Sequence, residues 1–263
     1  MDPYRFYVPD LLAQSAAAGG GGIRLPDDQA HHAKTVLRLT PGTPILLFDG
    51  NGAVAHATLA DGGGGKKHLP LTATITGGIT VNPAPAISLT LVTAVPKGDR
   101  AEWLVEQASQ LNVARIQWID CDRSVVKPKE GGAKIEKWRR LAIESAKQCH
   151  RTHLLHIEEP IPLQTLLAKL STQDSAVSTK HSLLWLEPRD DNSSKRLADM
   201  LAPTPPPHIT ALIGPEGGWS SREFQLLEQA AQQNQLTRIR LTDTILRIET
   251  ANAALAAIVM SAL

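Results

Sequence analysis

The residues best suited to do chemistry lie near the C-terminus, in two loops that each follow a predicted strand. The segment GPEGG at 214–218 comes directly after the apolar run ITALI at 209–213. Three glycines in five residues favour neither a helix nor a strand interior. The segment ILRIET at 245–250 lies between a short predicted strand at 239–241 and an alanine-rich helix that begins at Ala251. Loops of this kind are where α/β proteins bind ligands, so both segments predict a ligand site.

Several familiar chemistries do not match these segments. The spacing of the glycines is not that of a dinucleotide loop, and the lysine of a Walker loop is absent. The sequence also contains no Gly-x-Ser-x-Gly nucleophile elbow and no His/Cys spacing typical of a metal site. We therefore predict no metal.

The helix that follows the glycine loop carries a clear start signal. Ser220 and Glu223 have the spacing of a capping box, in which each side chain accepts a hydrogen bond from the backbone of the other. The sequence therefore predicts a helix N-terminus directly behind the loop.

Composition bounds the class of protein. The chain has 263 residues, 42% of them hydrophobic and 20% charged, which is enough for two globular domains. The net charge of +1 gives no overall field that would attract nucleic acid, so any basic surface must be local. Two cysteines do not make a disulfide framework. Without a signal peptide or an apolar run near the about 20 residues of a membrane span, we expect a soluble, cytoplasmic protein.

A proline-containing linker at 82–86 divides the chain into two segments with different sequence patterns. Residues 1–84 read as a small strand-rich domain with a hairpin turn, DGNG, at 49–52 and one helix from Asp27 to about Arg38. Glycine-rich tracts at 16–22 and 62–67 read as flexible loops. Residues 85–263 alternate about six strands with helices, which favours a largely parallel sheet covered on both faces. Asp99, with Glu102 three residues on, is predicted to cap the first helix there.

Positive charge gathers in one part of the second domain. Residues 123–151 contain nine Lys/Arg and three Asp/Glu. Such a run is either a solvated helix face or a contact for a phosphate backbone. We take RNA binding as the hypothesis, to be tested by salt dependence and by charge reversal of Lys127, Lys129 and Arg140.

The two C-terminal segments resemble the signature of the RsmE family, SPOUT-class methyltransferases that modify N3 of a uridine in small-subunit ribosomal RNA. The resemblance extends to RFYV at 5–8, HHAKTVLR at 31–38, KGDR at 97–100, EQASQL at 106–111, Arg123-Ser124 and WRR at 138–140, in the family's order. It covers nearly the whole chain. Two positions depart from the family pattern, which has Gly and Arg where this chain has Thr242 and Thr244.

The resemblance implies an N-terminal PUA-like β-barrel over 1–84 that binds RNA. Over 85–263 it implies a SPOUT α/β domain with a trefoil knot, which binds S-adenosylmethionine and works as a homodimer on small-subunit (16S) ribosomal RNA or the 30S particle. By motif match the cofactor residues are Leu186, Glu187, Ile213, Gly214, Pro215, Gly217, Gly218, Leu241, Ile245 and Leu246. The RNA-binding residues on the same basis are His32, Lys34, Arg38, Lys97, Arg100, Lys127, Lys129, Arg139 and Arg140.

Uridine N3 must lose a proton before it can accept a methyl group, and a fixed guanidinium would stabilise the resulting anion. We assign this role to Arg247, with Arg5 or Arg123 contributing from the RNA side; the alternative for Arg247 is an ion pair with Glu249. Two other functions stay open. One is a SPOUT methyltransferase acting on a ribose 2′-hydroxyl or a transfer RNA base, and the other is a non-catalytic RNA-binding protein of the same fold.

Overall fold

The computed structural model describes residues 2–19, 21–60, 70–127, 131–177, 181–187, 194–201, 204–233 and 235–262. The chain divides into two compact units. Unit 1 comprises Met1–Ala84 with Ala146–Leu154, and unit 2 comprises Pro85–Ser145 with Leu155–Leu263. The predicted linker at 82–86 spans the first crossing between them, but residues 146–154, which we expected in the second domain, group with unit 1. The domain limits themselves stay a prediction.

Unit 1 is built on a five-stranded sheet with the order β1-β3-β4-β5-β2. The edge strand β1 runs parallel to β3, and the other neighbours are antiparallel. The predicted hairpin turn joins β3 to β4, where Asp49 Oδ1 accepts from the amides of Asn51 at 2.7 Å and Ala53 at 3.0 Å. The strands are β1 (Tyr4–Tyr7), β2 (Ile23–Arg24), β3 (Pro44–Phe48), β4 (Ala53–Ala60) and β5 (Thr72–Val81).

The helices of unit 1 correct two sequence-based predictions. A helix, α1 (Leu11–Ala18), occupies part of the first tract that we expected to be a flexible loop, and Gly19 ends it in the left-handed conformation. The single helix expected from Asp27 to about Arg38 is two pieces, α2 (Asp27–His31) and a π-helical turn, η1 (His32–Val36). Arg38 itself has a φ of 54° and lies outside both. The second glycine tract, 62–67, lies outside the described residues.

Unit 2 is built on a seven-stranded sheet in which every neighbouring pair is parallel, which confirms the predicted α/β class. The strand order is β10-β12-β9-β11-β6-β7-β8. From β6 the chain proceeds outward to β7 and β8, then crosses to the other side of β6 to form β9, β11 and β12. The strands are β6 (Ser88–Ala94), β7 (Arg115–Asp120), β8 (His156–Pro162), β9 (His181–Leu186), β10 (Lys195–Arg196), β11 (His208–Ile213) and β12 (Thr237–Arg240).

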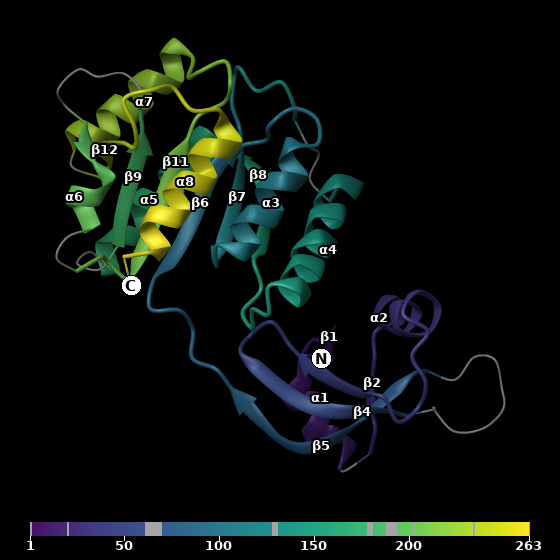
Figure 1. Ribbon diagram of the computed structural model, residues 1–263. Helices are drawn as coiled ribbons and strands as arrows, with labels where there is room; N and C mark the ends of the chain where they lie inside the picture. The colour runs from purple at the N-terminus through teal and green to yellow at the C-terminus, as the bar shows by residue number, and fades with distance from the viewer. Residues whose placement is uncertain are drawn as a thin grey trace. The chain divides into compact units, whose positions relative to one another are not determined.

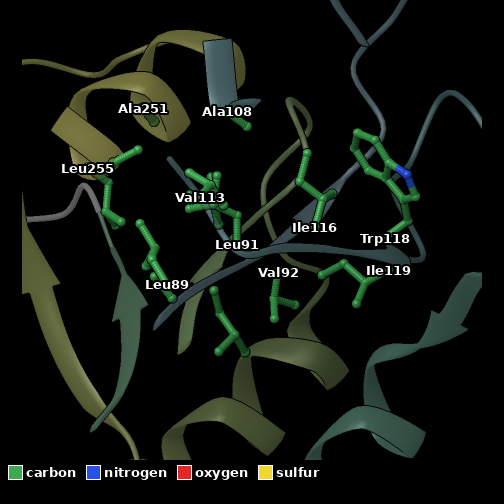
Figure 2. Close-up of a cluster of buried hydrophobic side chains, with 14 of the residues drawn as sticks. Leu89, Leu91, Val92, Ala108, Val113, Ile116, Trp118, Ile119, Ala251 and Leu255 are labelled. Carbon is green, nitrogen blue, oxygen red and sulfur yellow. The ribbon is translucent and has the colours of Figure 1, made fainter. Parts of the chain in front are cut away.

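Apolar side chains are buried on both faces of this sheet. Leu91 and Val92 are consecutive residues of β6, are 1% and 0% exposed, and point to opposite sides of the strand (Figure 2). Leu91 lies on the side of Ala108 and Ala251. Helices α3 and α8 pack against each other, and α8 also contacts β6 and β11 (Figure 1). The helices are α3 (Arg100–Gln110), α4 (Ala133–Gln148), α5 (Leu163–Val177), α6 (Leu197–Leu201), α7 (Ser221–Gln232) and α8 (Ile248–Met260).

The predicted cap of α3 is wrong. Asp99 has helical backbone angles and its side chain makes no capping hydrogen bond. Glu102 instead forms an ion pair with Lys137 of α4. The Glu102 carboxylate is thus directed to a neighbouring helix and not to the backbone of Asp99.

Of the helices in the described ranges, none is long and apolar enough to cross a bilayer.

Candidate functional site

A pocket of about 840 Å³ opens in unit 2, at the carboxyl ends of three adjacent parallel strands. Its wall is formed by the loops that follow β9, β11 and β12, together with residues after β6 and β7. This is the place where open α/β sheets bind ligands, next to the point where the strand order reverses. The lining residues are Arg100, Arg123, Leu186, Glu187, 213–219, 240–242, 244–248 and Ala251.

Strand register brings the three loops to one level. Leu186 at the end of β9 is paired with Ile213 of β11 on one side and Ile239 of β12 on the other. The amide of Glu187 donates to the carbonyl of Ile239 at 3.1 Å, which continues the pairing one residue beyond β9. Because the strands are parallel and in step, segments distant in sequence end at the same edge.

All ten residues assigned to the cofactor lie on the wall of this pocket, as do Arg123 and Arg247. The structure therefore brings together the residues that the two motifs supplied separately. Other lining residues were not predicted: Arg240, Thr242, Thr244, Trp219, Ile248 and Ala251. The sequence signal that could have identified these residues is that they lie within or next to the two motifs.

The glycine loop is compact and tightly packed. A Cβ at Gly214 would lie 2.8 Å from Cε2 and 2.9 Å from Nε1 of the Trp219 indole, so the ring packs directly on the glycine backbone. The amide of Gly218 donates to the carbonyl of Pro215 at 2.8 Å, and Gly218 has a φ of 69°. This left-handed backbone conformation favours glycine at position 218.

Behind the loop, the predicted capping box is present at the start of α7. The hydroxyl of Ser220 accepts from the amide of Glu223 at 3.2 Å, and Glu223 Oε2 accepts from the amide of Ser220 at 2.9 Å. The loop thus leads into a well-fixed helix N-terminus.

Two arginines on the pocket wall have different partners. Arg247 is the N-cap residue of α8 and is exposed, and its side chain makes no hydrogen bond or ion pair within the described part of the chain. The alternative pairing of Arg247 with Glu249 is therefore not seen. Arg100 instead lies 2.7 Å from Glu216 and 3.6 Å from Glu249 through its Nη1. Arg100, predicted to contact RNA, is held at the pocket by two carboxylates.

The two threonines that depart from the family pattern interact with each other. Thr242 Oγ1 donates to the carbonyl of Thr244 at 2.8 Å, and both residues are exposed. The hydrogen bond ties the ends of the short turn before Ile245, whose side chain is 83% exposed. The Thr242 side chain thus stabilises this turn, at a position where the family pattern has a glycine and therefore no side chain.

The remaining predicted catalytic residue, Arg5, belongs to unit 1. Its Nη2 donates to the carbonyl of Arg151 at 3.2 Å, and its guanidinium lies 5.2 Å from the centroid of the Phe48 ring. Burial lowers the pKa of both arginines, that of Arg151 to about 10. Both shifts reflect the loss of water around a guanidinium next to apolar groups.

The predicted RNA-binding residues are distributed over both units. In unit 1, Lys34 and Arg38 are exposed and His32 is half-buried. In unit 2, Lys97 and Arg140 are exposed, and Lys127 is exposed while paired with Asp120 at 2.9 Å. Lys129 lies outside the described residues.

Arg139 has an intramolecular role that the sequence did not reveal. Its guanidinium binds the carboxylates of Glu136 at 2.6 Å and Glu159 at 2.9 Å. It also donates to the carbonyl of Ile157, so Arg139 ties α4 to β8. With four contacts inside unit 2, this side chain has little capacity left for a phosphate.

Comparison with protein families gives the class of protein. Residues 82–260 match the model of an RNA methyltransferase domain, and residues 25–69 match that of an RNA methyltransferase PUA domain. Two curated relatives are both called ribosomal RNA small subunit methyltransferase E. The protein of Rickettsia conorii is 29% identical over 94% of this chain and 91% of its own length. The protein of Synechocystis sp. is 28% identical over 78% of this chain, and the match spans only 62% of the relative's length.

Solved structures show the same architecture. A methyltransferase from Legionella pneumophila, solved with bound S-adenosylmethionine, is 25% identical and superposes with a TM-score of 0.78 over 100% of this chain and 98% of its own. The ribosomal RNA small subunit methyltransferase E of Neisseria gonorrhoeae, also solved with S-adenosylmethionine, is 28% identical, with a TM-score of 0.75 over 98% and 96% of the two chains. The chain belongs to the RsmE family of RNA methyltransferases.

Proposed function

We propose that this protein transfers a methyl group from S-adenosylmethionine to N3 of a uridine in small-subunit (16S) ribosomal RNA. The observation that carries the proposal is the pocket itself. It joins a glycine loop, two further loops at the ends of β9 and β12, and an arginine without an intramolecular partner in the described chain. The names of the relatives, and the cofactor bound in two similar structures, support the same conclusion.

The chemistry of the pocket wall suits an adenosine-containing cofactor. Leu186, Ile213, Leu241 and Leu246 supply apolar surface for a flat ring, while the glycine loop leaves backbone N–H and C=O groups accessible. Bound S-adenosylmethionine would supply an electrophilic methyl group on a sulfonium. The residues of the chain would align the acceptor, exclude water and stabilise the deprotonated base. Alignment by itself lowers the barrier of such transfers considerably.

Arg247 is the residue we place at the acceptor. It is the N-cap residue of α8, lines the pocket, and pairs with no carboxylate among the residues that the structure describes. A guanidinium in this position would stabilise the negative charge that uridine acquires on losing the N3 proton. We assign Arg247 no part in removing that proton.

RNA would be held by exposed basic residues outside the pocket. Lys34 and Arg38 of unit 1 and Lys97, Lys127 and Arg140 of unit 2 are the candidates that remain exposed. Binding through these residues would weaken with salt, because each phosphate contact releases counterions. We include the homodimer and the trefoil knot of the SPOUT class in the proposal; light scattering of the purified protein tests the first.

Mass spectrometry of ribosomal RNA nucleosides from cells with and without the gene tests the function. We expect 3-methyluridine to disappear from 16S RNA on deletion, and to return with the wild-type gene but not with Arg247→Ala. A missing 2′-O-methyl nucleoside or transfer RNA base would point to another SPOUT activity. Unchanged nucleosides, together with no S-adenosylmethionine binding in calorimetry, would indicate a non-catalytic RNA-binding protein.

A further inference from the structure

A buried carboxylate joins two walls of the pocket. Glu223 lies in the first turn of α7 and is 5% exposed. The capping box accounts for only one of its oxygens, Oε2, which accepts from the amide of Ser220. The other oxygen, Oε1, accepts at 2.9 Å from the amide of Asp122, a residue 101 positions earlier in the chain.

Asp122 belongs to the loop that follows β7, and a second hydrogen bond reinforces the connection. The hydroxyl of Ser220 donates to Asp122 Oδ2 at 2.6 Å. We call these bonds among Asp122, Ser220 and Glu223 the loop tie. Because Ser220 directly follows the glycine loop and Trp219, the tie fixes the β7 loop against the end of the glycine loop.

The next residue, Arg123, shows what the tie positions. Its Nη1 donates to the carbonyl of Gly217 at 3.2 Å. A Cβ added at Gly217 would lie 3.2 Å from the Cβ of Arg123 and 3.3 Å from its carbonyl oxygen, so any side chain at Gly217 would require Arg123 to move by a few tenths of an ångström. Arg123 and Gly217 both line the pocket. Arg123 therefore connects the loop after β7 to the glycine loop, one residue away from the loop tie.

We propose that Glu223 is a positioning residue, which through the loop tie holds Arg123 against Gly217 and so keeps the glycine loop in the conformation that binds the cofactor. This inference rests on the proposed function, since the cofactor is taken to be S-adenosylmethionine. It assigns Arg123 to the wall of the cofactor site and leaves the acceptor base to Arg247. Arg123 would then affect cofactor affinity, whereas Arg247 would affect the transfer step.

Glu223→Gln is the sharpest test, because it preserves size while replacing one acceptor oxygen by a donor. Both oxygens face backbone N–H groups, so a glutamine can satisfy only one of them. We expect the dissociation constant for S-adenosylmethionine, measured by calorimetry, to rise about tenfold, the effect of one lost hydrogen bond to a charged group. In hydrogen exchange, the amides of 214–218 should exchange faster than in the wild type.

The matched control is Glu228→Gln in the same helix. The Glu228 carboxylate pairs with Arg238, and neither residue lines the pocket. This substitution should leave the affinity for S-adenosylmethionine unchanged. Folded Glu223→Gln protein with wild-type affinity would overturn the proposal. A wild-type protein that does not bind S-adenosylmethionine would refute the proposed function instead.

A second variant decides the matter if Glu223→Gln does not fold. Asp122→Ala removes the acceptor for the Ser220 hydroxyl from an exposed residue, and should weaken S-adenosylmethionine binding several-fold. Asp122→Asn keeps an acceptor oxygen and should restore affinity. At saturating cofactor, both variants should retain a near-normal kcat. Equal affinity of Asp122→Ala and the wild type would reject the loop tie.

Discussion

Gly214→Ala is the substitution whose effect follows most directly from the structure. The backbone of Gly214 is not left-handed, so alanine meets no conformational obstacle there. The obstacle is the indole of Trp219. A Cβ would lie 2.8, 2.9 and 3.1 Å from three of its ring atoms, whereas ordinary contact begins at 3.4 Å. The ring must therefore move by roughly half an ångström or more to accept one methyl group.

That displacement is costly because Trp219 is packed against the apolar core. Forcing a methyl group into a packed site typically costs about 1–3 kcal/mol. We expect Gly214→Ala to lower the free energy of unfolding by an amount in this range, measured by urea denaturation. Because Gly214 and Trp219 both line the pocket, affinity for S-adenosylmethionine should fall as well.

Two further variants separate the steric effect from a general loss of glycine. Gly218 has a φ of 69° and nothing within 4 Å of its Cβ position, so Gly218→Ala strains the backbone without displacing the indole. In the Trp219→Leu background the smaller side chain leaves room for the alanine. Gly214→Ala should therefore lower the free energy of unfolding less than it does in the wild type, a coupling that a double-mutant cycle measures. Wild-type stability and affinity in Gly214→Ala, or strict additivity in the cycle, would refute the packing argument.

Three more predictions concern the arginine, a buried amide and a thiol. Arg247→Ala should lower kcat about a hundredfold or more, the usual loss when a donor to a developing anion is removed, with little change in cofactor affinity; single-turnover assays with labelled cofactor would show it, and full turnover would reject the role. Asn252→Ala should lower the free energy of unfolding by about 1–3 kcal/mol, because the buried Asn252 amide donates to Thr93 Oγ1 at 3.1 Å; urea denaturation measures this. Burial, followed by the charge of Glu223, raises the pKa of the Cys121 thiol to about 12, so this thiol should resist alkylation in the folded protein at neutral pH. From about pH 9 towards 12 the unfolded chain loses the thiol proton and the folded chain keeps it, so the free energy of unfolding should fall, and Cys121→Ala should reduce that slope.

Local patterns determined much of the architecture. Apolar runs of strand length, each followed by a loop and a helix, predicted a parallel sheet because strands buried on both faces have no polar alternation. The glycine loop and the ILRIET segment predicted a ligand site because loops at the ends of such strands gather at one edge. The capping box at Ser220 was also predictable, since its partners are three residues apart.

Contacts between distant segments required the tertiary structure. Neither the approach of Arg100 to Glu216 nor that of Arg139 to Glu159 follows from spacing, because each depends on how a helix packs against a separate strand or loop. The short helix at Leu11–Ala18 was missed for a different reason: its residues are mostly strong helix formers and only Leu11 is buried, but the adjoining glycines led us to expect a loop. The π-helical turn at His32–Val36 has no local sequence signal that we recognised.

Glu223 shows the division most clearly. The sequence determined that one of its carboxylate oxygens caps a helix, because Ser220 is close enough in the chain to impose that geometry. Only the fold decided that the second oxygen binds Asp122, since parallel strands bring residues from β7 and β11 to the same edge of the sheet. A side chain's local partner is set by chain connectivity, whereas its distant partner is set by the register and order of strands, which no short motif encodes.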